Sequence, residues 1–310
     1  CQALSGIAKD LTKMSAKSAV KVLVPAEDHS GLFKWVAVLT GSKNALKGMG
    51  FFIGGALLSS VGFAGALGVM AIAVVVVLVF VLTVLPRSLG QAKRKAAFSG
   101  ILSNSTGINR LSLARLALFA ARDVWFVVSV PVFLASVLGW SFAQVGAFMA
   151  LWVIGYGAIQ AVAPVALRML IGTRAPGPGV TSVLGFVLAI VTAAIPVALS
   201  AHWPPAATML TGLALFGVVF AFNSSVHSFL VLAYSEGDRV SLTVGFYYMA
   251  NACGRLLGTL LSGLLYQFGG VATSMWGAVV LAAIAGTVAW RLPPVAVVPG
   301  TMWAGAGGDD

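Results

Sequence analysis

The chain consists of long apolar stretches separated by short polar turns. A helix needs about 20 mainly apolar residues to cross a bilayer, and eight stretches meet this requirement. They are Lys34–Val61, Ala66–Leu85, Leu111–Leu138, Phe142–Leu167, Val180–Ala201, Ala206–Leu232, Leu242–Phe268 and Val271–Trp290. No run alternates apolar and polar residues with a period of two, so the pattern predicts helices and no strands. We therefore expect an all-α integral membrane protein.

Composition agrees with this assignment. Of the 310 residues, 59% are hydrophobic and 9% are charged, whereas soluble domains carry about 25% charged residues. Two cysteines, Cys1 and Cys253, are too few for a disulfide framework, and we expect them to be packing residues. The sequence begins at Cys1 without a signal-peptide pattern, and we interpret it as a fragment that lacks its N-terminal part.

The turns between the apolar stretches are of two kinds. One kind contains no Lys, Arg, Asp or Glu; these turns are Gly62–Gly65, Gly139–Ser141, His202–Pro205 and Phe268–Gly270. The other kind is rich in Lys and Arg, which mark the cytoplasmic side of a membrane protein. Because the two kinds alternate, we expect a multi-pass protein with a cytoplasmic C-terminus. The formal net charge of +11 is thereby assigned to orientation and to contact with membrane lipid, and not to nucleic acid.

The longest polar interval between stretches is residues 87–110, and it is basic. We interpret it as a cytoplasmic linker between two membrane halves. Residues 1–86 would be the remainder of an N-terminal half (the end of helix 4, then helices 5 and 6), and residues 111–292 a C-terminal half (helices 7 to 12). Residues 293–310 are predicted to be a disordered cytoplasmic tail. The chain would then hold about eight complete transmembrane helices of twelve, with on the order of 100 residues missing.

A weak internal repeat fits two related halves. A shift of 208 positions matches Gly50 with Gly258, Gly55 with Gly263, Gly62 with Gly270, and Lys47 with Arg255. Structural repeats are usual in secondary transporters, whose substrate site lies near mid-membrane between them.

Four cations lie inside otherwise apolar stretches: Lys43, Lys47, Arg122 and Arg255. At 1.5 Å per residue, Arg122 is roughly 18 Å and Arg255 about 20 Å from the cytoplasmic ends of their helices. An ionisable side chain at this depth is costly and usually faces a water-filled path or a partner. Arginine binds phosphate-like oxyanions bidentately, and lysine adds a compact charge. These four residues are the candidate substrate-binding cations, and they favour a phosphate- or arsenate-bearing organic acid.

A second interpretation is that these cations pair with acids on the helices and only stabilise the fold. Asp123 is the only acid within any of the apolar stretches, so at most one cation could be neutralised in this way. Asp123 is also a candidate for proton coupling. Arg115 shares the helix face of Arg122 but is expected to snorkel to the inner surface.

Further polar residues flank this depth. Asn223, Tyr247 and Asn251 could bind the substrate or tie helices together. His227 could relay protons near neutral pH, or it could be a hydrogen-bonded structural residue. Gly50, Gly54, Gly55, Gly258 and Gly263 are expected to permit close approach between helices.

The sequence predicts neither an enzyme nor an ATP-driven pump. It contains no His/Cys cluster with metal-ligand spacing, no Gly-rich loop ending in Gly-Lys-Ser/Thr, and no Ser/His/Asp set. We expect no metal site, no catalytic residues and no cofactor.

Several runs resemble a known transporter family. They are SGIAKDLTKMSAKSAVK (5–21), TGSKNALKG (40–48), ARDVWFVVSVPVFL (121–134), LWVIGYG (151–157), NSSVHSFLVLAY (223–234) and VGFYYMANACGRLLGTLLSGLLYQ (244–267). These runs are similar to the ArsJ family of organoarsenical efflux permeases in the major facilitator superfamily, over about residues 1–290. The resemblance implies a bacterial inner (plasma) membrane protein with the major facilitator fold.

The resemblance also implies a substrate. It is 1-arseno-3-phosphoglycerate, which a glyceraldehyde-3-phosphate dehydrogenase makes by using arsenate in place of phosphate. Export by alternating access would confer arsenate resistance, since the ester releases arsenate outside the cell. Two alternatives remain open: a major facilitator permease for another organic phosphate, anion or drug, and a membrane protein that binds an anion without transporting it.

Overall fold

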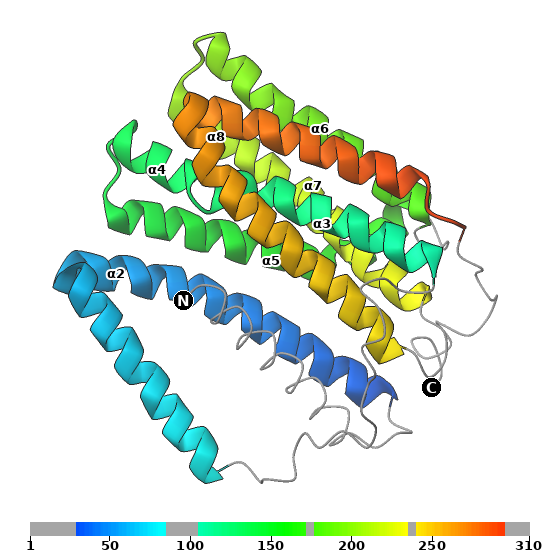
Figure 1. The fold of residues 1–310 in the computed structure, drawn as a ribbon, viewed down its shortest axis with the longest axis horizontal. Helices are drawn as coiled ribbons and strands as arrows, with labels where there is room; N and C mark the ends of the chain where they lie inside the picture. Colours follow the sequence, from blue (N-terminus) through cyan, green and yellow to red (C-terminus); the bar gives the residue numbers. More distant parts are fainter. Residues whose placement is uncertain (1–28, 85–104, 172–176, 235–239, 295–310) are drawn as a thin grey trace. The chain divides into compact units, whose positions relative to one another are not determined.

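The computed structural model describes residues 29–84, 105–171, 177–234 and 240–294. Within these ranges the chain is helical and contains no strand (Figure 1). The chain divides into two compact units, Cys1–Ala97 with Val298–Asp310, and Phe98–Val297. The boundary between them falls in the predicted linker at 87–110, most of which lies outside the described residues, as does the predicted tail. We describe each unit by itself.

The first unit contains helix α2 (His29–Val84), and the second unit contains the other helices. These are α3 (Thr106–Phe126), α4 (Ser129–Ser136), α5 (Phe142–Ile171), α6 (Pro178–Ser200), α7 (Pro205–Ala233) and α8 (Val240–Trp290). In the described part of the chain, six helices are long and apolar enough to cross a membrane, which confirms the prediction of an all-α chain suited to a bilayer.

Two of these six helices are bent at glycines. In α2 the break lies at Gly62, with φ of 69° and ψ of −178°, and in α8 it lies at Gly269 and Gly270, the latter with φ of 67°. Positive φ is accessible to glycine at no steric cost. Both breaks fall in turns predicted from the sequence, so α2 and α8 each contain two of the eight predicted stretches as the two legs of a bend (Figure 1).

The stretch predicted as a single span at Leu111–Leu138 is instead divided into α3 and α4. The break at Val127 and Val128 has a cause in Pro131, which lacks an N–H and whose ring clashes with the carbonyl four residues before it. In α8, the Ser262 hydroxyl accepts hydrogen bonds from the backbone N–H groups of Val128 and Ser129, each at 3.2 Å. Since a bilayer offers no water to unpaired backbone groups, this contact stabilises the break.

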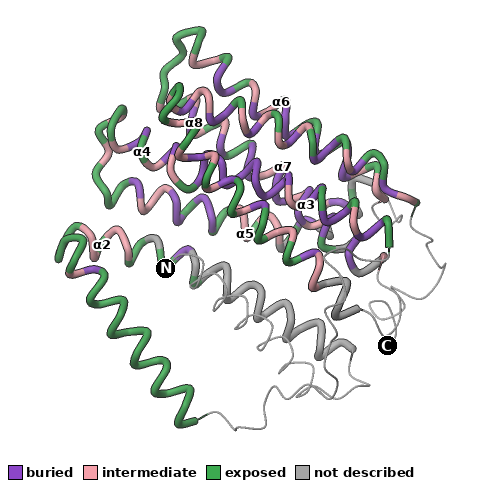
Figure 2. Tube along the Cα trace, in the orientation of Figure 1, coloured by how far each residue is buried: buried purple, intermediate pink, exposed green. Residues whose placement is uncertain are grey.

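Helix α3 is the centre of the second unit (Figure 2). The Thr106–Ser136 span is 72% buried, whereas the other spans of this unit are 28–39% buried. Its side chains at Leu118, Val124 and Trp125 are fully covered. The Trp125 ring packs edge-on against Trp152 of α5 and Phe216 of α7, at centroid distances of 5.2 and 5.1 Å. The charged side chains in the inner part of α3, Arg115, Arg122 and Asp123, are accordingly buried.

The two ends of the second unit differ in charge. At one end, Arg110 at the start of α3 donates to the carbonyl of Arg291 after α8 at 2.5 Å, and the Tyr234 hydroxyl after α7 donates to the carbonyl of Pro293 at 2.6 Å. The uncharged turns at 139–141, 202–204 and 269–270 lie together at the opposite end, at the upper left in Figure 1. This is the separation that the alternation of charged and uncharged turns predicts.

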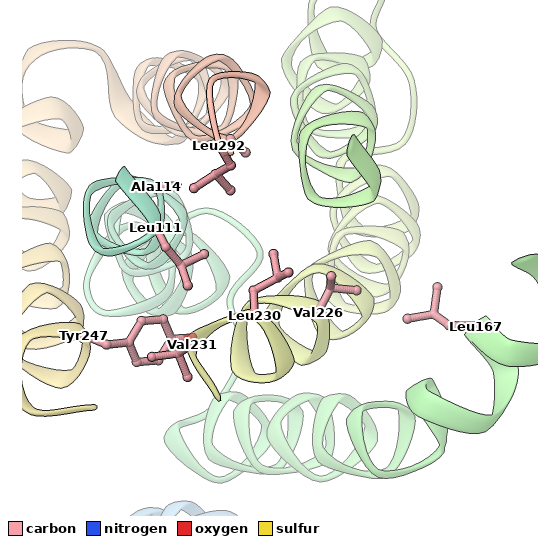
Figure 3. Close-up of a cluster of buried hydrophobic side chains, with 9 residues drawn as sticks. Leu111, Ala114, Leu167, Val226, Leu230, Val231, Tyr247 and Leu292 are labelled. Atoms are coloured by element: carbon pink, nitrogen blue, oxygen red, sulfur yellow. The ribbon is translucent and has the colours of Figure 1, made fainter. Parts of the chain in front are cut away.

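An apolar cluster fills the end of the second unit at which Arg110 and Arg291 lie. It joins α3, α5, α7 and both ends of α8 through buried side chains that include Leu111, Leu230, Val231, Tyr247 and Leu292 (Figure 3). The Tyr247 ring of α8 points towards Val231 of α7 in this view. Ser112 and Arg115, which follow Leu111 along α3, are buried next to this cluster.

Candidate functional site

One carboxylate in the second unit pairs with two arginines. Asp123 Oδ1 accepts from Arg122 Nε at 2.6 Å and lies 2.5 Å from Arg122 Nη2, while Asp123 Oδ2 accepts from Arg255 Nε at 3.0 Å. The Asp123 and Arg122 side chains are 1% and 6% exposed, and that of Arg255 is 37% exposed. The structure thus brings together both arginines predicted as substrate ligands and the acid predicted for proton coupling.

The sequence interpretation allowed Asp123 to neutralise at most one cation, and the structure shows that its carboxylate contacts two. Arg122 precedes Asp123 on α3, whereas Arg255 reaches the same carboxylate from α8. In charge, however, one acid still offsets only one cation. The three side chains therefore carry a net positive charge near the middle of their spans, Thr106–Ser136 and the first leg of α8.

Two glycines on α8 make this contact between α3 and α8 possible. A Cβ added at Gly254 would lie 2.2 Å from the Leu116 carbonyl oxygen, and one at Gly258 would lie 2.9 Å from the Asp123 Cβ. Residues four apart share a helix face, and small residues at this spacing let helix backbones approach closely. The expectation for Gly258 is confirmed. Gly263, in contrast, faces open space. Gly50 and Gly54 lie on α2 in the first unit, and for them the expectation stays a prediction.

Aromatic rings surround the Arg122 guanidinium. Its central carbon lies 4.8 Å from the Phe119 ring centroid, 5.6 Å from that of Phe220 and 5.8 Å from that of Phe126. Arginine is weakly hydrated for a cation and stacks on aromatic faces, and such contacts gain strength when they are desolvated. These rings help to stabilise a buried positive charge whose only anionic partner among the described residues, the Asp123 carboxylate, is shared with Arg255.

Arg115 does not snorkel to the surface, as the sequence predicted, but is buried with 6% exposure. Its Nη1 donates to the Ser224 carbonyl at 3.2 Å and lies 3.0 Å from the Ser224 hydroxyl. The guanidinium carbon is 4.0 Å from the Phe119 ring centroid and 4.9 Å from that of Tyr247. Because α7 and α8 cover this face of α3, the side chain is held between the helices and turned away from the inner surface.

Arg115 has no acidic partner within 4.0 Å among the described residues. Sequence reasoning missed it as a site residue although its spacing of seven from Arg122 placed both on one face of α3. That spacing was the available signal. What the sequence did not reveal was that α7 and α8 bury Arg115.

The polar residues predicted on α7 are buried beside Arg115. Asn223, Ser224 and His227 are at most 1% exposed, and His227 lies within electrostatic reach of Arg115. Both amide atoms of Asn223 and the Nδ1 of His227 lack a hydrogen-bond partner among the described residues. In a low-dielectric interior each such unpaired group is costly.

Of the polar residues predicted on α8, Asn251 shows the same feature, because its Oδ1 has no hydrogen-bond partner within the described part of the chain. The buried Tyr247 hydroxyl lies beside the Ser228 side chain of α7. In contrast, the Ser225 hydroxyl donates to the Gln160 carbonyl and joins α7 to α5, while the Ser228 hydroxyl donates to the Ser224 carbonyl within α7. The predicted distinction between packing serines and candidate ligand residues is consistent with these contacts.

Two of the four predicted cations cannot be placed in the site. Lys43 and Lys47 lie in α2, but their side chains fall outside the described part of the structure. The second unit by itself provides Arg115, Arg122, Asp123 and Arg255, which we call the arginine cluster. Its formal charge is +2, since three arginines face one aspartate. Among the described residues, no group of three or more His, Cys, Asp or Glu side chains could hold a metal ion.

Comparison with protein-family models, curated proteins and solved structures found no match for this chain. The resemblance to the organoarsenical efflux permeases and the major facilitator fold therefore stay predictions. The candidate site is defined by its burial, its contacts and its charge.

Proposed function

We propose that the protein is a secondary active transporter of the major facilitator superfamily that exports 1-arseno-3-phosphoglycerate from the bacterial cytoplasm. The observation that carries the proposal is the arginine cluster, in which membrane-spanning helices hold three arginines and one acid, and the acid pairs with Arg122 and Arg255 only. Excess positive charge at membrane depth marks a pathway for an anion more often than a structural contact. The quoted runs that resemble the ArsJ family supply the identity of the anion.

The chemistry of the cluster fits a phosphorylated or arsenylated acid. Guanidinium groups stay charged when they are desolvated, and their planar fork matches tetrahedral oxyanions. The Nε of Arg255 is held by Asp123, while this side chain remains 37% exposed. An arriving oxyanion could therefore bind the exposed part of Arg255 and compete with Asp123 for its guanidinium.

Asp123 offers a route for coupling. While it is ionised, it occupies both arginines. Protonation would remove its charge and leave Arg122 and Arg255 available to an oxyanion. Binding of a proton by Asp123 and binding of an oxyanion by the arginines would then favour each other. Alternating access would expose the loaded and unloaded site to opposite sides of the bacterial inner membrane.

Everted membrane vesicles that contain the full-length protein test this function. We expect labelled arsenate to accumulate only when glyceraldehyde-3-phosphate dehydrogenase, glyceraldehyde 3-phosphate, its nicotinamide cofactor and arsenate are all present. Accumulation with arsenate alone would contradict the organoarsenical substrate. Accumulation of a different organic phosphate, with no response to the complete mixture, would favour the alternative permease. Stabilisation by the anion without any accumulation would identify a binding protein.

A further inference from the structure

We propose that Arg115 forms a second oxyanion subsite in the same transport site, so that the protein recognises an acid with an anionic group at each end of a short carbon chain. This inference rests on the proposed function and deepens it. The first subsite is formed by Arg122 and Arg255 with Asp123. The second is formed by Arg115 of α3 with polar side chains of α7 and α8.

The hydrogen bonding of Arg115 is incomplete for a buried cation. Of its donors, Nη1 bonds to Ser224, whereas the buried Nε has no partner among the described residues. The only acid in the described spans near this level, Asp123, is already paired with Arg122 and Arg255. Leaving a buried charged donor unpaired costs more than leaving a neutral one unpaired. An oxyanion would supply both the missing acceptor and the missing negative charge.

Other polar side chains lie around the same guanidinium. The Tyr247 ring centroid is 4.9 Å from its central carbon, and the buried Tyr247 hydroxyl lies beside the Ser228 side chain. His227 lies one turn beyond Ser224 on α7 and is 1% exposed, and its Nδ1 is unpaired within the described ranges. A hydroxyl and an imidazole can both donate to phosphate-like oxygens. Three helices thus contribute to one group of potential anion ligands.

A contact that only ties helices together does not explain this arrangement. To join α3 to α7, a neutral donor at position 115 bonded to Ser224 would be enough, without the cost of a buried charge. The packing contacts of Arg115 with Phe119 and Tyr247 reduce that cost but give no counter-charge. The positive charge itself is what a structural role leaves unexplained.

Phe119 links the two subsites. Its ring centroid lies 4.0 Å from the guanidinium carbon of Arg115 and 4.8 Å from that of Arg122. Both cations therefore contact the same aromatic ring. The separation cannot exceed the sum of these distances, which is the scale of a three-carbon acid with a tetrahedral oxyanion at each end. A short bis-oxyanion, such as the phosphorylated acyl arsenate of the proposed function, is the ligand class that two such subsites would take.

A matched pair of stable ligands separates the two subsites. Propane-1,3-diylbisphosphonate has two tetrahedral oxyanions, and propylphosphonate has one on the same carbon chain. Their dissociation constants would be measured by titration calorimetry on the purified full-length protein. We expect the wild-type protein to bind the bisphosphonate roughly tenfold or more tightly than the monophosphonate, since a charge-assisted hydrogen bond contributes that much.

Substitutions then test whether Arg115 causes the tighter binding of the bisphosphonate, which we call the bisphosphonate advantage. We expect Arg115→Gln to bring the two dissociation constants together while that of propylphosphonate stays within about twofold of wild type. This retained binding would also show that the variant is folded. Arg115→Lys keeps the charge and should recover part of the advantage, whereas Arg255→Gln should weaken both ligands. If Arg115→Gln does not fold, Tyr247→Phe should still reduce the advantage, because it removes only a hydroxyl that can donate to the second oxyanion.

Three results would overturn the second subsite: equal affinity of the wild-type protein for both ligands, an advantage that survives Arg115→Gln and Tyr247→Phe, or equal weakening of both ligands by Arg115→Gln. If vesicles still accumulate the organoarsenical, these results would leave the proposed transport intact. Binding of neither ligand by the wild-type protein would count against both the subsite and the proposed function.

Discussion

At the scale of single residues, the most informative feature is the sharing of Asp123 by two arginines that differ in exposure. Arg122 is buried among aromatic rings, so Asp123 is the counter-ion that compensates its charge. Arg255 is 37% exposed on the side chain and can be solvated in part. The two ion pairs therefore differ in what they contribute. Loss of the Arg122 pair should lower the stability of the fold more, whereas the Arg255 pair is the more accessible to a ligand.

Asp123→Asn should destabilise the protein. The substitution leaves Arg122 buried without a counter-ion, and removal of one partner from a buried ion pair costs about 3–5 kcal/mol. Unfolding of the detergent-solubilised protein, followed by circular dichroism, measures the loss. Asp123→Glu, which keeps the charge, serves as the control and should lose less. A loss below about 1 kcal/mol for Asp123→Asn would show that this aspartate is not the counter-ion of Arg122.

At the scale of helices, the site depends on how closely α8 approaches α3. Gly254 and Gly258 flank Arg255 and face the backbone of α3 at Leu116 and Ala120. The same segment of α8 also supplies Ser262, which caps the break between α3 and α4. One leg of α8 thus fixes both the ion pair and the broken helix, and its packing should be sensitive to single atoms.

Gly254→Ala should separate the two helices. The added Cβ would lie 2.2 Å from a backbone oxygen of α3, which cannot move aside as a flexible side chain could, and overpacking of this kind costs about 1–3 kcal/mol. Gly263→Ala on the same helix is the matched control, because its Cβ meets open space and alanine is a better helix former than glycine by up to about 1 kcal/mol. Unfolding measurements on both variants should give opposite signs. Equal effects would contradict the close approach at Gly254.

Ser262→Ala should destabilise the break between α3 and α4. It leaves the buried N–H of Ser129 without its side-chain acceptor, and an unsatisfied buried group costs about 1–3 kcal/mol. Ser136→Ala is a suitable control, because the exposed Ser136 hydroxyl bonds only to the carbonyl of Val132 in its own helix and should change stability by no more than about 0.5 kcal/mol. Hydrogen exchange at Val128 and Ser129 should rise in Ser262→Ala alone. Unchanged exchange would show that the hydroxyl is not needed there.

At the scale of the whole molecule, α2 and α8 resemble each other in a way that the sequence repeat predicted. The shift of 208 positions matches Gly62 with Gly270, and these two glycines have nearly equal φ values of 69° and 67° at the breaks of the two helices. The same shift matches Lys47 with Arg255. Each of the two helices thus bends at the matched glycine and carries a cation in its first leg, and the assignment of these helices to two related halves stays a prediction.

Much of the fold could be predicted from the sequence, because span length and glycine turns are local properties. The apolar stretches located the helices, and the uncharged turns located the bends at Gly62 and Gly270. The interruption of the third stretch at Val127 could have been inferred from Pro131, since the effect of proline on the preceding turn is also local.

The site was predicted only in part. Counting residues along the helices identified Arg122 and Arg255 by depth, but the sharing of Asp123 depends on how α3 and α8 pack. The burial of Arg115 depends in the same way on α7 and α8. Such tertiary contacts are not encoded in any single stretch. The spacing of Gly254 and Gly258 around Arg255 was the one local signal of that packing, and only Gly258 was recognised.

The most direct test of the central claim, that the arginine cluster binds the transported anion, is uptake by Arg255→Gln in everted vesicles. Asp123 keeps Arg122 as its partner in this variant, so we expect the free energy of unfolding to stay within about 1 kcal/mol of wild type. Uptake of arsenate label from the complete dehydrogenase mixture should fall by about tenfold or more, since a charge-assisted contact to the substrate is lost. Arg291→Gln, outside the cluster, should transport normally. A stable Arg255→Gln protein with uptake within about twofold of wild type would contradict the account.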